Sequence, residues 1–235
     1  MLVFALLGSG CDTLLQVAGT VLEEAEPSQV EIIQGLKEAL STGTGRAVTT
    51  LAREGGYLDD PLVKIPFPEE VQFAANTLRD IGMGALVDNL VERLNRGAEK
   101  GAQAALPIFR DAIREMTFAD AKNILLGGDN AATAYFQSKT RDKLVTAFSP
   151  HIRQSLDEVH ATEIWTELTT RYNSIPLVRK KVDTDIVSYA TDKALDGLFL
   201  KLAAEEKLIR QDPIARSSEL LKKVFGYAAR QQTGN

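Results

Sequence analysis

The sequence predicts an all-α protein: a single irregular multi-helix domain with one long C-terminal helix. Apolar residues recur at three- and four-residue steps along most of the chain, as at Val30, Ile33, Leu36 and Leu40, which is the spacing of an amphipathic helix. No stretch alternates apolar and polar residues for more than about four positions, so no strand is expected. No fixed-period repeat is visible, which disfavours a solenoid. We therefore expect one helical domain over residues 28–230.

Capping residues and helix breakers set the expected boundaries in the first half of the chain. Ser28 is a favoured N-cap, and Thr117 with Asp120 three residues later is typical of a capping box. Pro107 suits a first helical turn. Three prolines within residues 57–68 predict an irregular connection. The expected helices are 28–40, one around 48–52, 69–81, 85–105, 107–116 and one that starts after 117, with breaks at 42–45, 55–56, 82–84 and 127–128.

The second half of the chain predicts longer helices. Asp129 is expected to cap the first of them, and Ser149 with Pro150 to open the next. Asp183 is expected to cap the longest helix, which Asp212 and the following proline would end. A frayed tail is expected after the last helix. The segments are 130–148, a helix opened at 149–150, 161–173, 184–211, 217–230 and the tail 231–235.

Composition excludes several classes of protein. The chain has 235 residues, of which 44% are hydrophobic and 25% charged, and this is ordinary for a folded domain rather than a disordered one. One cysteine and two histidines can build neither a disulfide scaffold nor a zinc site of the usual Cys/His kind. The net charge of −5 argues against a nucleic-acid partner. We predict no metal and no cofactor.

The N-terminus has the order of a bacterial lipoprotein signal. Residues 1–7 are uncharged and apolar, the small residues 8–10 follow, and Cys11 then stands at the position that is acylated in such proteins. The leader is short and lacks a Lys or Arg. We expect Cys11 to anchor the chain in a membrane, inner or outer, with the domain in the periplasm and residues 12–27 as a tether. The alternative is an ordinary apolar segment with a buried thiol, in a cytoplasmic protein. Asp12 and the glutamates after it interrupt any membrane span.

One carboxylate falls on an apolar helix face. Glu206 lies inside the stripe of the long helix that should face the core, and Glu205 lies at its border. A carboxylate in that place must be paired or shift its pKa. Arg210, one turn later, is the nearest cation. Two interpretations stay open: a structural ion-pair network, or the polar lining of a pocket. Further candidate members are Asp212, Arg216, Asn95 and Glu99.

The segment 129–148 is expected to lie centrally. Small residues at positions 131, 134 and 138, with Val145, predict a face for close helix contact, and Tyr135 and Phe136 point about 100° apart. Asp129 and Tyr135 are therefore candidate site residues. Other motifs predict no catalytic residue: Gly43–Arg46 lacks the Lys-Ser/Thr ending of a phosphate loop, and Gly-x-Ser-x-Gly is absent. Asp157, His160 and Glu163 are best explained as a solvated face.

Several phrases together resemble a known family. They are Asn95-Arg-Gly-Ala-Glu99, Met116-Thr-Phe-Ala-Asp-Ala121, Leu125-Leu-Gly-Gly-Asp-Asn-Ala-Ala-Thr-Ala-Tyr-Phe136, Glu205-Glu-Lys-Leu-Ile-Arg-Gln-Asp-Pro213 and Leu220-Leu-Lys-Lys-Val-Phe-Gly226. In this order they resemble the bacterial proteins with the domain of unknown function 4197, over about residues 28–227. The resemblance implies a helical fold and an exported or lipoprotein-like start, which agrees with Cys11. It implies no activity, because the family has none established.

Three functions are compatible with these features. The first is a non-catalytic, lipid-anchored envelope protein that binds an unknown protein partner. The second is a carrier of a small apolar or amphipathic ligand, with Glu206, Arg210 and Tyr135 as polar handles. The third is an enzyme that uses carboxylates and Tyr135. A closed core with Glu206 fully paired would favour the first, and a cavity on the order of a few hundred Å³ the second. Unpaired carboxylates in an open cleft would favour the third.

Overall fold

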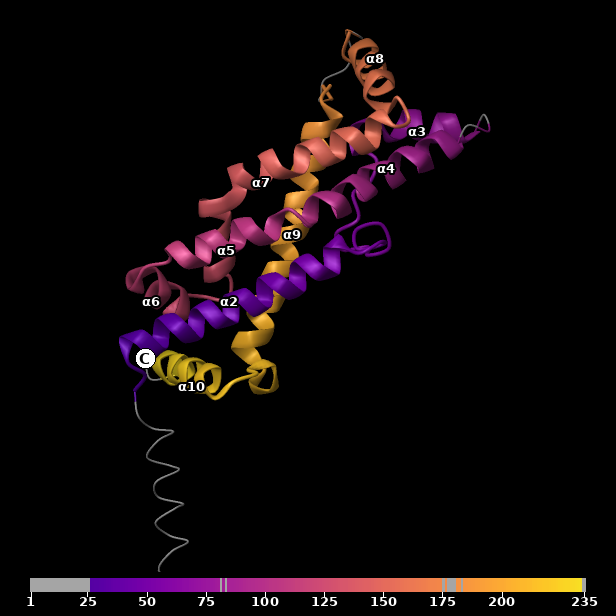
Figure 1. Ribbon diagram of the computed structural model, residues 1–235. Helices are drawn as coiled ribbons and strands as arrows, with labels where there is room; N and C mark the ends of the chain where they lie inside the picture. Colours follow the sequence, from indigo (N-terminus) through magenta and orange to yellow (C-terminus); the bar gives the residue numbers. More distant parts are fainter. Residues whose placement is uncertain are drawn as a thin grey trace, which may run out of the picture.

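The computed structural model describes residues 26–80, 82, 84–174, 176, 181–182 and 184–233. Within them the chain is helical and forms no strand, which confirms the all-α prediction (Figure 1). The α-helices are α2 (Gln29–Ala52), α3 (Gln72–Asp80), α4 (Gly84–Ala102), α5 (Ala105–Glu115), α6 (Phe118–Leu126), α7 (Ala131–Asp157), α8 (Ala161–Asn173), α9 (Ile186–Gln211) and α10 (Glu219–Thr233). Two short 3₁₀ turns, η1 (Glu69–Val71) and η2 (Pro213–Ala215), precede α3 and α10.

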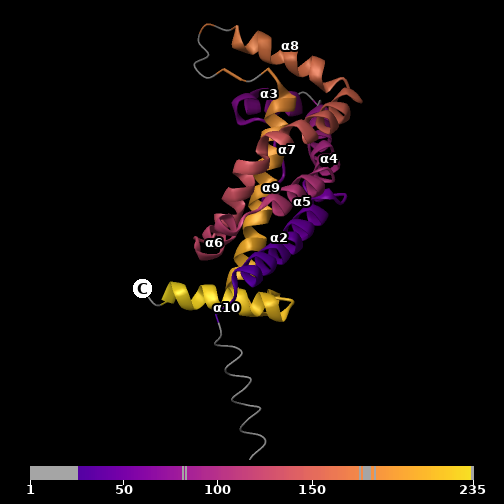
Figure 2. The ribbon, with the colours of Figure 1, turned by 60° about the vertical axis from the view of Figure 1, so that its left-hand side comes forward.

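Helix α9 organises the molecule. It packs against α2, α4 and α7, and it crosses these helices steeply in both ribbon views (Figures 1 and 2). Helix α10 crosses one end of the bundle, where it contacts the start of α2 and also α6. Helix α8 lies at the opposite end (Figure 2). No helix of the described residues has the length and apolar character of a membrane span.

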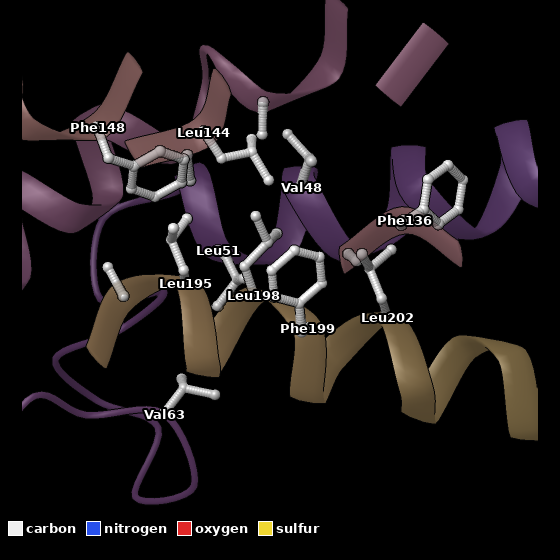
Figure 3. Close-up of a cluster of buried hydrophobic side chains, with 14 of the residues drawn as sticks. Val48, Leu51, Val63, Phe136, Leu144, Phe148, Leu195, Leu198, Phe199 and Leu202 are labelled. Carbon is white, nitrogen blue, oxygen red and sulfur yellow. The ribbon is translucent and has the colours of Figure 1, made fainter. Parts of the chain in front are cut away.

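The core lies between α9 and the helices that it crosses. In Figure 3 the side chains of Leu195, Leu198, Phe199 and Leu202 rise from α9 toward α2 and α7. All four are nearly inaccessible to solvent, which confirms the predicted apolar stripe. They meet Val48 and Leu51 from α2 and Phe136, Leu144 and Phe148 from α7.

Helices α4 and α7 pack closely, and the small residues that allow this lie on a different helix from the one predicted. The predicted small face of α7 is wrong, because Ala134 and Ser138 are exposed. The buried face of α7 instead follows four-residue steps through Phe136 and Leu144, and the glycines stand on α4. A methyl group at Gly97 would lie 2.7 Å from the Cα of Ile152, so only hydrogen fits there. The central place predicted for this segment is nevertheless confirmed, since α7 contacts α4, α5, α6 and α9.

The predicted break at residues 42–45 is wrong, since α2 runs through it without interruption. A Cβ at Gly43 would stand 3.5 Å from the Cβ of Glu205 and 3.7 Å from Ile209, so this glycine brings α2 close to α9. Thr44 is buried, and its hydroxyl donates to the carbonyl oxygen of Leu40 at 2.7 Å. The glycines here therefore serve helix packing rather than helix termination.

Two predicted starts in the second half are also wrong. Pro150 lies inside α7, which continues to Asp157. Proline costs a backbone hydrogen bond there, but Phe148 and Ile152 on either side are fully buried and hold the helix in place. The N-cap of α9 is Asp185, whose side chain accepts from the Val187 and Ser188 amides, whereas Asp183 lies outside the described residues.

The end of α7 separates three residues that were expected to share a face. His160 has a φ of 55°, which breaks the helix between Asp157 and Glu163. All three side chains are exposed, and the carboxylate of Asp157 accepts from the hydroxyl of Thr162. The solvated interpretation of these residues agrees with that exposure, although the three do not lie on one helix.

Other boundaries are confirmed. Ser28 and Thr117 each form a capping box, with Glu31 and Asp120 respectively. The prolines at 61, 66 and 68 lie in a connection without α-helix between α2 and η1. Helix α10 extends to Thr233, a few residues beyond the predicted end.

Candidate functional site

Glu206 provides the N-terminal cap of a helix that is distant in sequence. Its Oε1 accepts from the backbone amide of Ala132 at 2.9 Å, and its Oε2 accepts from the amide and the hydroxyl of Thr133, also at 2.9 Å. These amides belong to the first turn of α7, where the helix dipole favours a negative charge. The capping role predicted for Asp129 is wrong: the N-cap is Asn130, which makes no side-chain capping bond.

Arg210 caps the end of the preceding helix. Its guanidinium donates to Oε1 of Glu206 at 2.8 and 3.0 Å, as the one-turn spacing predicted. The same group donates to the carbonyl oxygens of Ile124 at 2.7 Å and Leu125 at 3.2 Å, in the last turn of α6. A cation thus faces the carbonyl end of α6 and an anion the amide end of α7. We call this set, Glu206 and Arg210 with the ends of α6 and α7, the helix junction.

Arg216 and Asp212 terminate α9 rather than extend the ion pair. Arg216 donates to the carbonyl oxygens of Ile209 at 3.1 Å and Arg210 at 2.7 Å, which satisfies the last turn of α9. Burial lowers the pKa of Arg216. The carboxylate of Asp212 accepts from the amide of Ile214 and caps η2. Both residues border the helix junction but bind backbone.

Asn95 and Glu99 form a second network, remote from Glu206. The Asn95 side chain is fully buried; it accepts from the amide of Ile65 at 2.8 Å and donates to the carbonyl of the same residue at 2.9 Å. Glu99 Oε1 accepts from the amides of Tyr57 and Leu58 at 3.2 Å each. The two side chains therefore hold both ends of the irregular connection on α4. We call this set the connection clamp.

The same connection is also tied to α9. The hydroxyl of Tyr57 donates to the carbonyl of Ala194 at 2.8 Å, and burial together with Glu99 raises the pKa of that phenol well above its ordinary range. Lys201 donates to Asp60 and thereby holds the pKa of that carboxyl below its usual value. The connection is consequently held from two helices at once.

Tyr135 belongs to neither network. Its hydroxyl donates to the carbonyl of Ala112 on α5 at 3.2 Å, and its ring contacts that of Phe136. Burial is the main cause that raises the pKa of this phenol. Tyr135 is therefore a contact between α5 and α7, and the structure does not bring it to Glu206.

A small cavity lies beside the helix junction. Its volume is about 20 Å³, enough for roughly one water molecule. Thr44, Thr133, Glu205 and Glu206 contribute its polar lining. Oε2 of Glu205 is buried without a hydrogen-bond partner, and Arg46 lies 3.7 Å from it. Among the described residues, no group of three or more His, Cys, Asp or Glu is placed to hold a metal ion.

Comparison with known proteins gives one result. The family model described as "Protein of unknown function (DUF4197)" matches residues 26–226, which is most of the chain. The chain belongs to this family. Neither the curated proteins nor the solved structures contain a match. The predicted resemblance is thus confirmed, and with it comes no assigned activity.

The phrases that carry the family resemblance converge in this DUF4197 protein. Leu125–Phe136 and Glu205–Pro213, far apart in sequence, together build the helix junction. Asn95–Glu99 supplies the connection clamp. Asn95, Glu99, Glu206 and Arg210 of these phrases bind backbone groups of other segments, so in this chain they hold helix ends and a connection in place.

The sequence reasoning missed a surface feature of this DUF4197 chain. Two adjacent hollows, of about 350 and 390 Å³, lie along the outward face of α9 and share Leu62 and Leu200 as lining residues. Leu200 lies outside the predicted apolar stripe of α9, and a leucine on the polar face of a helix could have indicated an exposed apolar site. No such indication exists in the sequence for Leu62, because the neighbours of this residue depend on how the connection folds back against α9. We call the two hollows together the α9 groove; the lining is Leu62, Val63, Lys64, Pro66, Asp129, Asn130, Lys193, Asp196, Gly197, Leu200, Lys201, Ala203, Ala204 and Lys207.

Proposed function

We propose that this DUF4197 protein is a non-catalytic interaction module of the bacterial cell envelope, anchored to a membrane by a lipid on Cys11 and binding another protein through its helical surface. The observation that carries this proposal is the use of its buried polar side chains. Asn95, Glu99, Glu206 and Arg210 each bind backbone groups of a distant segment, and in the described part of the chain none of these four faces a cleft large enough for a substrate.

Glu206 illustrates the point. A general acid or base has to reach a substrate proton at hydrogen-bond distance. Both oxygens of this carboxylate are occupied by Ala132, Thr133 and Arg210, and the residue is only 9% exposed. Asn95 and Glu99 are committed in the same way to the connection. This pairing supports a structural role and weighs against the carboxylate-dependent enzyme.

The carrier hypothesis has less support. A site that encloses a small organic ligand measures about 300–1,000 Å³, whereas the cavity that reaches Glu206 measures about 20 Å³. The larger hollows at the described surface are open and lie along helix faces. An open groove is better suited to a segment of another protein than to an enclosed ligand.

The anchor rests on the sequence alone, since residues 1–25 lie outside the described part. Cys11 follows an apolar leader and small residues, as in lipoproteins, and residues 12–27 would link it to the Ser28 cap. A lipid on Cys11 would hold the domain at the membrane surface and leave its helical faces free for a protein partner.

The anchor is tested by fractionating cells that express the full chain. We expect the protein in the membrane fraction, with mass spectrometry showing an acylated Cys11 as the first residue. Cys11→Ser should move it out of that fraction, whereas the control Thr13→Ser should stay with the membranes. An unmodified Cys11 with residues 1–10 still attached would contradict the anchor.

The interaction role is tested by crosslinking in cells that produce the anchored chain, followed by identification of the crosslinked species. We expect a reproducible protein partner. If no protein is crosslinked and native mass spectrometry instead finds a small molecule bound to the purified chain, the carrier function replaces the one proposed.

A further inference from the structure

We infer that the α9 groove is the docking site for an acidic amphipathic helix of the partner protein. This inference rests on the proposed interaction role and names the surface and the chemistry of the partner. Four properties of the groove support it: its shape, its exposed apolar centre, its charge and the rigidity of its walls.

The shape fits a helix. Helix α9 packs against α2, α4 and α7 on one side, and its opposite side carries the groove. The groove runs from Lys193 to Lys207, which corresponds to about 21 Å at the helical rise. Leu200 stands at its centre, and Ala203 and Ala204 next to it allow a second backbone to approach. That length accommodates about four turns of a bound helix.

The apolar centre of the groove is exposed to solvent, which favours binding of another apolar surface to it. Leu62 is 73% exposed and Leu200 is 47% exposed, and the two line both hollows. An apolar strip of this kind, with polar residues around it, is typical of surfaces that bind the apolar face of an amphipathic helix. The hollows on either side of the two leucines would receive the side chains of that face.

The charge selects an acidic partner. The lining contains four lysines, at 64, 193, 201 and 207, and two aspartates, at 129 and 196, although the whole chain has a net charge of −5. Lys201 is paired with Asp60, and Asp196 lies 3.7 Å from Arg141. Lys64, Lys193 and Lys207 are exposed, and none of them forms an ion pair with another described residue. A positive rim on an acidic protein favours carboxylates on the partner and steers their approach.

The two buried networks fix the walls of the groove. The connection clamp holds Ile65, and Lys201 holds Asp60, so the segment that carries Leu62 is fastened on both sides. At the other end, Asp129 and Asn130 belong to the turn between α6 and α7 that the helix junction closes. A preformed groove loses little conformational entropy on binding.

A membrane surface is the less suitable occupant. A bilayer is flat on the scale of the groove, so it would touch the rim without filling the two hollows. Anionic lipid could still bind the lysines by charge alone. The test therefore includes vesicles as a separate arm.

The probe is a synthetic peptide of about 18 residues, with leucine and alanine on one helical face and glutamate on the other. The matched control peptide carries lysine in place of every glutamate. Binding to the full chain is measured by fluorescence anisotropy, and the surface is located from nuclear magnetic resonance shifts. We expect the acidic peptide to bind with shifts along α9, and the basic peptide to bind at least about tenfold more weakly.

Matched variants test the groove itself. Lys193→Glu combined with Lys207→Glu should weaken acidic-peptide binding about tenfold, and Leu200→Gln should weaken it by a similar factor. Lys122→Glu combined with Lys143→Glu makes the same change of net charge at two exposed lysines outside the groove lining. Leu208→Gln changes a leucine of α9 that is 42% exposed and lies outside the groove lining. Both controls should bind as the parent chain does.

Each outcome decides. Equal binding of acidic and basic peptides, no binding of the acidic peptide, or equal losses in the groove and control variants would overturn the inference. Binding to phosphatidylglycerol vesicles that depends on Lys193 and Lys207, without peptide binding, would make the groove a lipid surface and overturn it too. If the partner crosslinked in cells persists in the double lysine variant, the groove is wrong while the interaction role stands. If the parent chain crosslinks no protein, the proposed function itself fails.

Discussion

Glu206 accepts hydrogen bonds from Ala132, Thr133 and Arg210 through a carboxylate that is almost withdrawn from water. Taking a carboxylate out of water is costly unless cations and hydrogen-bond donors replace the lost hydration. Here the replacement comes from the first turn of α7 and from a guanidinium that is itself bound to the end of α6. The side chain is thus the meeting point of three helices.

We predict that Glu206→Ala lowers the free energy of unfolding by about 3 kcal/mol, because it leaves Arg210 and two helix amides without their partner. Urea denaturation followed by circular dichroism measures the change. A loss below about 1 kcal/mol would show that the junction contributes little to stability.

The control for this variant is the neighbouring residue. Glu205→Ala removes a carboxylate whose Oε2 makes no hydrogen bond and whose closest cation, Arg46, is 3.7 Å away. We expect its effect to stay within about 1 kcal/mol. Similar losses in the two variants would indicate a general effect of removing acidic side chains from this turn of α9 rather than the loss of the junction.

At the scale of elements, α4 and α7 show how glycine sets the distance between helices. A Cβ at Gly97 would lie 2.7 Å from the Ile152 backbone, and one at Gly101 would lie 2.8 Å from the Phe148 ring. Both are closer than carbon atoms approach without a shift of the structure. The two helices therefore depend on hydrogen atoms at these positions, and Phe148 and Ile152 fill the space so created.

We predict that Gly97→Ala lowers the free energy of unfolding by about 2 kcal/mol, because α4 and α7 must move apart. Gly45→Ala is the matched control, since it lies inside α2 with open space around the position of its Cβ. That variant should stabilise the protein by about 0.5–1 kcal/mol through helix propensity. Thermal unfolding of both variants measures the difference, and a stabilising Gly97→Ala would refute the close contact.

Some helix boundaries differ from those predicted because tertiary packing outweighs local helix propensity. Gly43 and Pro150 are helix breakers by propensity, yet both lie inside continuous helices. Their local cost is of order 1 kcal/mol for glycine and about 3 kcal/mol for proline. Buried neighbours such as Phe148 and Ile152 contribute about 1.5–3 kcal/mol each through burial, which is enough to outweigh it.

At the scale of the whole molecule, an ion pair joins the two ends of the described chain. Lys223 of α10 donates to Glu31 in the first turn of α2 at 2.6 Å. The hydrogen bond from Lys223, with further bonds from Ser28, lowers the pKa of Glu31 from 4.5 to about 2. The lowered pKa means that the charged form stabilises the fold. This contribution is complete above pH 4.5 and is lost as the pH falls toward about 2.

We predict that Lys223→Met makes the protein less stable near neutral pH, and that the difference from the parent chain shrinks between about pH 4.5 and 2. In the variant the pKa of Glu31 should rise, which a magnetic resonance titration of the carboxyl carbons measures. The control is Lys222→Met, whose partner Glu219 has an 89% exposed side chain. A Glu31 pKa that does not respond to Lys223→Met would contradict this link between α2 and α10.

Part of the structure can be predicted from the sequence, because that part depends on the spacing of nearby residues. The all-α class, the N-cap at Ser28, the capping box at Thr117 and the buried stripe of α9 all follow from residues within a few positions of one another. The pairing of Glu206 with Arg210 also follows, since one helical turn separates them.

The rest was decided by tertiary structure. Three features depend on contacts between segments far apart in sequence. Glu206 caps α7, and Asn95 and Glu99 hold the connection at Ile65 and Tyr57. Leu62 lines the same groove as Leu200. Backbone amides and carbonyls look alike at every position, so a sequence reveals that a buried polar side chain needs a partner but not which helix end will supply it. Only the packing of α9 across the bundle makes that choice.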